Sequence, residues 1–138
     1  MGDWYVIAGR VTFLEKDAYN PIESYRWNAE KERVDINFTF NSGSFTGKKK
    51  AIPQKGYIYN KNTNAYWKVS PIWPLKFGYL VIDLDEDYQW TVIGVPSQKY
   101  LWIMARTPQI SESLYSEIVS RIEDKKYNTQ DIKKMPQQ

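Results

Sequence analysis

The sequence contains no histidine and no cysteine among its 138 residues. Within this chain, their absence excludes Ser–His–Asp triads, cysteine nucleophiles, disulfides, iron–sulfur clusters, and zinc or haem held by His or Cys. We therefore expect no metal and no cofactor. Any catalysis would depend on carboxylates, Tyr, Lys, Ser or Thr.

Long apolar runs are also lacking. The strongly apolar stretches, such as residues 101–105, fall far short of the roughly 18–20 residues that span a bilayer. The first residues show neither the basic leader nor the apolar segment of a secretory signal. We therefore expect the chain as given to be soluble, with any export leader lying outside it.

The charges are nearly balanced, with 19 basic and 16 acidic residues and a net charge of +3. A nucleic-acid-binding protein usually gathers Lys and Arg on one face, whereas the one basic run here is Lys48, Lys49 and Lys50. A solvated strand or loop face explains this run. The alternatives are approach to an anionic lipid or ligand, and a β-barrel nucleic-acid module. We favour the solvated face and expect no nucleic-acid partner.

Aromatic residues make up 16% of the chain. Several short segments alternate apolar and polar residues, and the clearest is 34–40, which is typical of a half-buried strand. Turn residues separate these segments. We expect eight strands, at about 4–10, 22–29, 34–41, 45–52, 64–70, 77–84, 88–95 and 99–106. Short strands at even spacing indicate an all-β sandwich or barrel.

The last expected strand favours a barrel because both of its faces are apolar. Trp102 and Met104 lie on one face, and Leu101 and Ile103 lie on the other. Two apolar faces need two covers. One cover is then the barrel interior, and closing the sheet also removes exposed edges.

The outer cover is expected from a helix. After Pro108 the apolar residues fall on one stripe of an amphipathic helix over residues 111–126, and Ser111 is a suitable N-cap. We therefore expect one all-β domain over residues 1–138, with strands at about 4–106 and one C-terminal α-helix. The tail, 127–138, is expected to hold a short strand and then fray.

An eight-stranded barrel either fills with side chains or holds one small ligand. The inward candidates are large and apolar, so a cavity would favour an acyl chain, stabilised by roughly 0.8 kcal/mol per buried CH₂. The candidate ligand-binding residues in the strands are Tyr25, Trp27, Ile36, Phe38, Phe40, Trp67, Val69, Tyr79 and Trp102. Trp73, between two prolines, is either a packed loop anchor or a lip of the site.

Three short motifs lie at corresponding strand ends. Gly2 and Trp4 form a Gly-x-Trp motif in the first strand, Asp87 and Tyr88 precede the seventh strand, and Arg106 ends the eighth. In order and spacing these motifs resemble those of the lipocalins. Each motif alone is weak, but the three together, followed directly by a helix, are specific.

The resemblance covers about residues 2–125 and is most specific over 79–108, where it points to bacterial lipocalins of the outer-membrane lipoprotein type. It implies an eight-stranded antiparallel up-and-down β-barrel, closed at one end and open at the other. It further implies that Trp4 and Arg106 stack as a structural plug at the closed end, with Tyr88 nearby. The implied ligand is a fatty acid or lysophospholipid.

The same resemblance implies where the entrance lies. The loops near 10–21, 41–46, 71–76 and 96–99 would ring the open mouth. Trp73 and Lys76 would then stand at the entrance, where the lysine meets an anionic head group. Bacterial members of this type carry a signal peptide and a lipidated Cys, which implies the outer membrane or periplasm. This chain as given carries neither, so membrane association would need a leader absent from it.

An enzyme on the same scaffold, an isomerase or synthase acting on a lipid-like substrate, is the alternative function. Catalysis needs titratable groups that converge inside the cavity. Glu23, Asp83 and Asp85 show no such convergence in sequence, and we interpret them as turn or solvent-facing groups. The sequence therefore predicts a non-enzymatic transport or storage protein, which we expect to be a monomer or weak homodimer.

Overall fold

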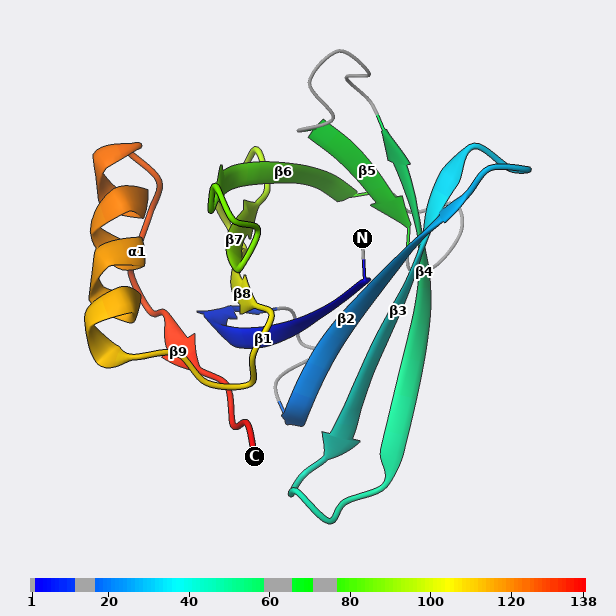
Figure 1. The fold of residues 1–138 in the computed structure, drawn as a ribbon, viewed down its shortest axis with the longest axis horizontal. Helices are drawn as coiled ribbons and strands as arrows, with labels where there is room; N and C mark the ends of the chain where they lie inside the picture. The colour runs from blue at the N-terminus through cyan, green and yellow to red at the C-terminus, as the bar shows by residue number, and fades with distance from the viewer. Residues whose placement is uncertain (1, 12–16, 59–65, 71–76) are drawn as a thin grey trace.

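The computed structural model describes residues 2–11, 17–58, 66–70 and 77–138, with side chains left out from 58 to 79. Eight antiparallel strands enclose a common interior, and one helix lies outside them (Figure 1). The strands are β1 (Gly2–Arg10), β2 (Ala18–Asn28), β3 (Arg33–Ser42), β4 (Lys49–Ile58), β5 (Tyr66–Ser70), β6 (Phe77–Leu84), β7 (Trp90–Gly94) and β8 (Leu101–Ala105). Helix α1 (Glu112–Asp124) and the short strand β9 (Lys133–Lys134) follow.

The sheet closes on itself. Consecutive strands pair from β2 to β8, β8 pairs with β1, and β1 pairs with β2 over residues 2–5. This closure pairs the two strands that would otherwise be the edges of the sheet. The predicted eight-stranded antiparallel up-and-down barrel with one C-terminal helix is therefore confirmed.

Alternation along the strands produces an apolar inner face. On β3, for example, buried residues alternate with more exposed polar ones, as the period of two predicts. The buried side chains that meet inside the barrel form what we call the inner cluster: Trp4, Val6, Ala18, Tyr25, Val34, Ile36, Phe38, Phe40, Ile93 and Met104. They come from five different strands, so the cluster ties opposite walls of the barrel together.

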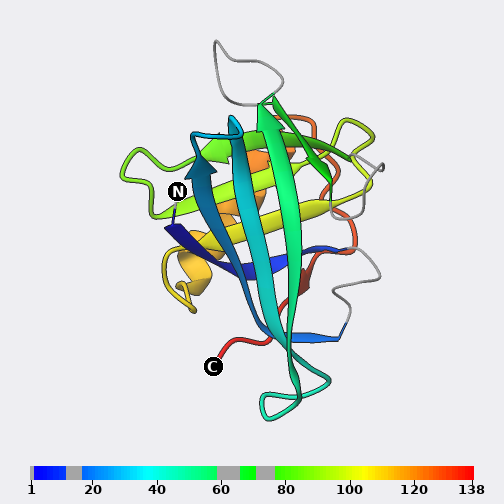
Figure 2. The same cartoon turned by 90° about the vertical axis from the view of Figure 1, so that its right-hand side faces the viewer.

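A second apolar cluster lies on the outside of β1, β7 and β8, beneath α1. This outer cluster comprises Ile7, Ala8, Trp90, Val92, Leu101, Ile103, Ala105, Ile118, Ile122 and Tyr127. Figure 2 shows α1 behind the strands, on the side away from β2, β3 and β4. Strand β8 therefore has an inner face and a helix-covered face, as its two apolar sides predict.

The helix begins where its capping residue indicates. The hydroxyl group of Ser111 accepts a hydrogen bond from the backbone N–H of Leu114 at 3.1 Å. Glu112 lies in the first turn and Arg121 in the last, which suits the helix dipole. Observed and expected helix ends agree within two residues.

Two expected strand positions are wrong. Strand β2 begins at Ala18 instead of residue 22, and β4 runs over Lys49–Ile58 instead of about 45–52. The loop before β4 is closed by a 2.9 Å hydrogen bond from the N–H of Ser42 to the carbonyl of Lys48. A side chain on Gly47 would collide with the carbonyl of Ser42, so this glycine maintains the turn and delays the strand.

The expectation that the tail frays is also wrong. Strand β9 pairs with Ala8 and Gly9 of β1, in keeping with the short strand predicted there. Beyond it, the side-chain amide of Gln137 donates to the carbonyls of Val6 and Pro21, both at 2.9 Å. These carbonyls lie past the point where β1 and β2 stop pairing. The tail is held because it supplies donors that a neighbouring strand would otherwise give.

Candidate ligand-binding site

The end of the barrel that is expected to be closed is built around Trp4 and Arg106. The guanidinium carbon of Arg106 lies 3.7 Å from the centroid of the Trp4 ring, and Trp4 is 6% exposed. Arg106 also donates to the carbonyl of Asp3 at 3.0 Å and to that of Tyr88 at 3.3 Å. Burial lowers the pKa of Arg106 from its ordinary value, against the opposing effect of the Asp3 charge. The predicted stacking contact is present.

The remaining motif residues have distinct places at this end. Gly2 has a φ of +86°, and a side chain there would crowd the guanidinium of Arg106. Tyr88 has a φ of 56° and an exposed side chain, so it contributes through its carbonyl. Asp87 stays exposed in the turn before β7, where its carbonyl accepts from the side chain of Gln89. The contacts of the expected plug are therefore made by Gly2, Trp4, Arg106 and the backbone of Tyr88.

The opposite end is organised around Arg10, the last residue of β1. Its guanidinium donates to the backbone carbonyls of Gln98, Lys99, Asn128 and Gln130, at distances between 2.6 and 3.1 Å. These bonds tie the β7–β8 loop to the segment that follows α1. One of the predicted mouth loops is thus held by hydrogen bonds from the Arg10 side chain to its backbone carbonyls.

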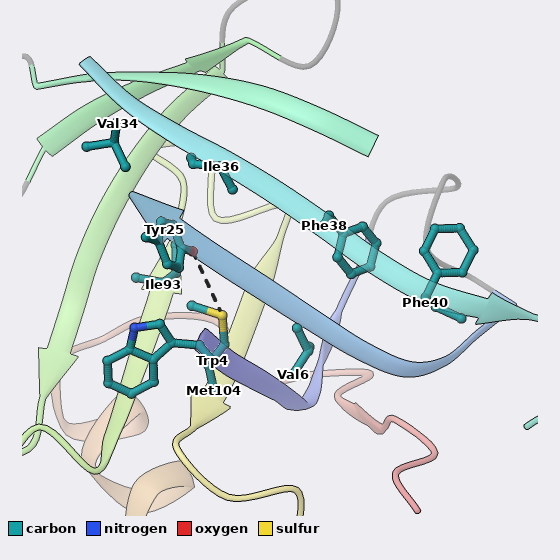
Figure 3. Packing of buried hydrophobic residues seen from close by; sticks show 10 residues of the cluster. Trp4, Val6, Tyr25, Val34, Ile36, Phe38, Phe40, Ile93 and Met104 are labelled. Atoms are coloured by element: carbon teal, nitrogen blue, oxygen red, sulfur yellow. Dashed lines mark hydrogen bonds between the residues drawn. The ribbon is translucent and has the colours of Figure 1, made fainter. Parts of the chain in front are cut away.

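Ile36, Phe38 and Phe40 form one wall of the interior. All three side chains are buried on β3, and the rings of Phe38 and Phe40 are stacked with centroids 5.1 Å apart. Figure 3 shows the three side chains along β3, and all three belong to the inner cluster. Trp102 packs against the same inner cluster from β8. These four residues therefore face the barrel interior, as the alternation predicts.

Tyr25 and Glu23 form a polar pair on the inner face of β2. Tyr25 is 5% exposed, and its hydroxyl donates to the carboxyl group of Glu23 at 3.2 Å. The same hydroxyl lies 4.0 Å from the sulfur of Met104 across the interior (Figure 3). Glu23 itself is 7% exposed. A carboxyl group therefore lines the interior beside the apolar residues.

The interpretation of Glu23 as a turn or solvent-facing group is consequently wrong. The error follows from starting the second strand at residue 22, which places Glu23 near a strand end. With the strand starting at Ala18, Pro21, Glu23 and Tyr25 alternate onto one buried face. The sequence does contain a signal for this placement, because Glu23 stands two residues before the inward-facing Tyr25.

Asp83 and Asp85 lie apart from the interior. The side chain of Asp83, on β6, receives two hydrogen bonds from Arg121 of α1, at 2.7 and 3.1 Å. Burial acts to raise the pKa of Asp83, but the bonds from Arg121 and from the backbone of Leu84 outweigh it, so the pKa lies below its ordinary value. Asp85 accepts from the backbone of Gln89 in the turn before β7, as its interpretation as a turn residue requires. Asp83 instead anchors the helix.

One predicted inward residue points elsewhere. Trp27 is 48% exposed near the end of β2, so the prediction that it lines the interior is wrong. Alternation identifies the face of a strand, but it does not show where a hairpin extends past the enclosed volume. Trp67, Val69 and Tyr79 lie in described strands, with side chains outside the description. Trp73 and Lys76 lie outside the described residues.

Two further observations concern the parts of the chain that the structure describes. No helix there is long and apolar enough to cross a membrane. Within the same ranges, no three acidic residues gather where a metal ion would be held.

Comparison with known proteins places this geometry in a family. The chain matches the lipocalin-like domain family over residues 1–137. It is 32% identical to temperature-induced lipocalin-1 of Arabidopsis thaliana, over 99% of this chain and 76% of that protein. It is 31% identical to the outer membrane lipoprotein Blc of Escherichia coli K12, over 87% of this chain and 67% of that protein.

A solved structure shows the same fold at low sequence identity. Lobster apocrustacyanin A1 superposes with a TM-score of 0.77 at 12% identity, covering 99% of this chain and 77% of that one. This likeness concerns the fold alone. Together, the closed barrel, the Trp4–Arg106 plug and the sequence matches show that the chain belongs to the lipocalin-like family, which implies a non-enzymatic protein that binds a small hydrophobic ligand.

Proposed function

We propose that the protein binds a fatty acid or a lysophospholipid inside the barrel and transports or stores it unchanged. The observation that carries this proposal is the inner cluster, a set of large apolar side chains enclosed by a closed sheet. An acyl chain lying against such a surface gains about 0.8 kcal/mol for each CH₂ removed from water. Aromatic residues such as Phe38 and Phe40 offer broad, rigid faces for that contact.

The distribution of carboxyl groups favours binding over catalysis. Glu23 lies on the inner face of the sheet, whereas Asp83 lies under α1 and is engaged by Arg121. A pair of carboxyl groups acting as acid and base on one lipid would have to lie close together. These two act in separate places, which supports a role without chemical conversion.

The head group of the lipid is proposed to remain at the end opposite the Trp4–Arg106 plug. Because strand directions alternate, the start of β4 lies at that end, and Lys48, Lys49 and Lys50 are exposed there. Exposed lysines raise the local concentration of anionic ligands. An acyl chain would therefore enter with its apolar end first.

The cellular location belongs to the same proposal. One similar protein is named an outer membrane lipoprotein, so we propose that this protein works at the outer membrane or in the periplasm. The 138 residues contain no cysteine and therefore no lipidation site among them. We propose a monomer or weak homodimer as the binding unit.

The test is a titration of delipidated protein with a fluorescent fatty acid. We expect saturation near one ligand per barrel, with quenching of tryptophan emission. Phe40→Glu places a charge in the interior and should abolish binding, whereas Ser120→Glu on the exposed side of α1 is the matched control and should leave it intact. Lack of binding across several chain lengths would contradict the proposal. Native mass spectrometry of the same sample reports the number of copies.

A further inference from the structure

We propose that the tail, over residues 135–138, is part of the ligand-binding site: it closes the barrel wall between β1 and β2 and presents Met135 to the bound lipid. The inference rests on the proposed function and deepens it, since it adds a wall and a contact residue to the same site. It starts from the place where β1 and β2 stop pairing.

Strands β1 and β2 pair along only part of their length. The ladder between them runs from the plug and ends at the pair Tyr5 and Ile22. Just before Ile22, β2 contains Pro21, which has no backbone N–H to donate, and Asn20, whose φ of 52° lies in the left-handed region. These two residues cannot continue a regular ladder with β1. The wall is therefore left incomplete in the half of the barrel that lies away from the plug.

The tail supplies the main-chain contacts that are missing there. Beyond β9, the N–H of Met135 donates to the carbonyl of Ile7 on β1 at 2.8 Å. The next residue, Pro136, accepts at its carbonyl from the N–H of Asn20 on β2, also at 2.8 Å. The side-chain amide of Gln137 then bridges carbonyls of both strands. The tail therefore lies between β1 and β2 as a section of the barrel wall.

The two faces of the tail have different surroundings. Ile132 packs against the outer cluster, and Lys134 forms an ion pair with Glu112 of α1. Met135 instead packs against the inner cluster. Its side chain thus lies on the face of the wall that a lipid inside the barrel would contact. The flexible, polarizable thioether of methionine adapts well to an acyl chain.

The amide of Gln137 shows that this section of the wall is held less firmly than its neighbours. Its nitrogen makes the two bonds to the strands, but its oxygen is buried with no hydrogen-bond donor in the part of the chain that the structure describes. An unpaired buried acceptor is costly. Continuous ladders, in contrast, join β1 to β8 and β2 to β3. We therefore expect the tail to detach before these strands separate, and its detachment to release the lipid.

The first test measures contacts between lipid and tail in the unaltered protein. Delipidated protein carrying ¹³C-labelled methionine methyl groups, with deuterium elsewhere, is saturated with oleate, and nuclear Overhauser contacts to the acyl chain are recorded. We expect contacts at the methyl group of Met135. The methyl group introduced by Ile132→Met lies on the outer face of the same tail, so it is the matched control and should show none.

A pair of truncations gives a second measurement. Met135→Ala should weaken oleate binding about fourfold, the factor expected when the ligand loses contact with roughly one methylene group. Ile132→Ala trims a partly buried apolar side chain on the other face of the tail and should change the affinity far less. Titration of the two variants beside the unaltered protein measures both effects.

The role of the tail as a wall is tested by the rate of lipid release. Gln137→Ala removes the bridge between β1 and β2 and should speed dissociation several-fold, measured as transfer of a fluorescent fatty acid to phosphatidylcholine vesicles. Gln138→Ala, at the exposed neighbouring glutamine, is the control and should leave the rate unchanged.

The outcomes separate the two proposals. Oleate binding without contacts at Met135, equal losses of affinity in Met135→Ala and Ile132→Ala, or an unchanged release rate in Gln137→Ala would each overturn the inference and leave lipid binding intact. Failure of the unaltered protein to bind oleate would instead overturn the proposed function itself.

Discussion

The inner and outer faces of the barrel strands differ in what packs against them. The outer cluster is covered by residues of this chain, because Ile118, Ile122 and Tyr127 pack over it. The ion pair between Asp83 and Arg121 fixes the helix in place. The inner face carries a buried carboxyl group, that of Glu23, beside Tyr25 of the inner cluster, an arrangement that a core selected for stability alone would avoid. The difference indicates that the outer face serves stability and that the inner face also serves binding.

The largest expected effect lies at the closed end. Trp4→Ala should lower the free energy of unfolding by about 3–5 kcal/mol, because it removes a buried aromatic side chain and leaves a cavity. It also removes the surface on which Arg106 stacks. Denaturant titration followed by circular dichroism measures the change. Trp27→Ala, at a half-exposed tryptophan, is the control and should cost far less. Equal losses for both would refute the role of Trp4 as a plug.

The next effect tests the outer face. Ile118→Ala should cost about 3 kcal/mol, because Ile118 is fully buried between α1 and the sheet. Ligand affinity should stay the same, since this side chain lies outside the barrel. Ser120→Ala, on the exposed side of the helix, controls for changes in helix propensity. A loss of affinity as large as the loss of stability would show that the two faces are coupled.

Local sequence patterns predict much of the difference between the inner and outer faces. Period-two alternation identifies the inward side chains of β3, and the doubly apolar strand β8 predicts both the barrel and its covering helix. These rules fail where the burial of a side chain depends on its position along the barrel axis. Trp27 has the expected face but lies where the hairpin extends beyond the interior. Glu23 falls near a strand end only if the strand starts at residue 22, whereas β2 starts at Ala18.

The tail could not be predicted for a different reason. Its attachment depends on where two other strands stop pairing, because only there do the carbonyls of Val6 and Pro21 need donors. That point is a property of the closed sheet, and no local pattern around Gln137 encodes it. The same holds for the four carbonyls that converge on Arg10.

A smaller effect concerns pH and the outer face. The pKa of Asp83 lies below its ordinary value of 3.8 in the folded state, so its contribution to stability is complete above that value. As the pH falls below about 4, the unfolded chain takes up the proton first, and the contribution is lost as the pH approaches the lower pKa of the folded state. Asp83→Asn should therefore flatten the decline in stability under acid.

Melting temperatures measured between pH 7 and pH 2 check this prediction. The control is Glu86→Gln, at an exposed residue in the turn before β7, which should keep the decline of the unaltered protein. An unchanged acid profile in Asp83→Asn would mean that the ion pair with Arg121 does not hold the helix in solution.

The variants with the smallest expected loss of stability give the sharpest test of the difference between the inner and outer faces. Phe40→Leu trims a ring at the end of the inner cluster that lies away from the plug, and it should cost about 1 kcal/mol. Val92→Ala trims the outer cluster by a similar amount of apolar surface and should cost about as much. Matched losses of stability allow the two variants to be compared directly in a fatty-acid titration. Phe40→Leu should weaken binding several-fold because the ligand loses a wall contact, whereas Val92→Ala should not. If both variants weaken binding equally, the lipid affinity follows overall stability, and the inner face has no special role.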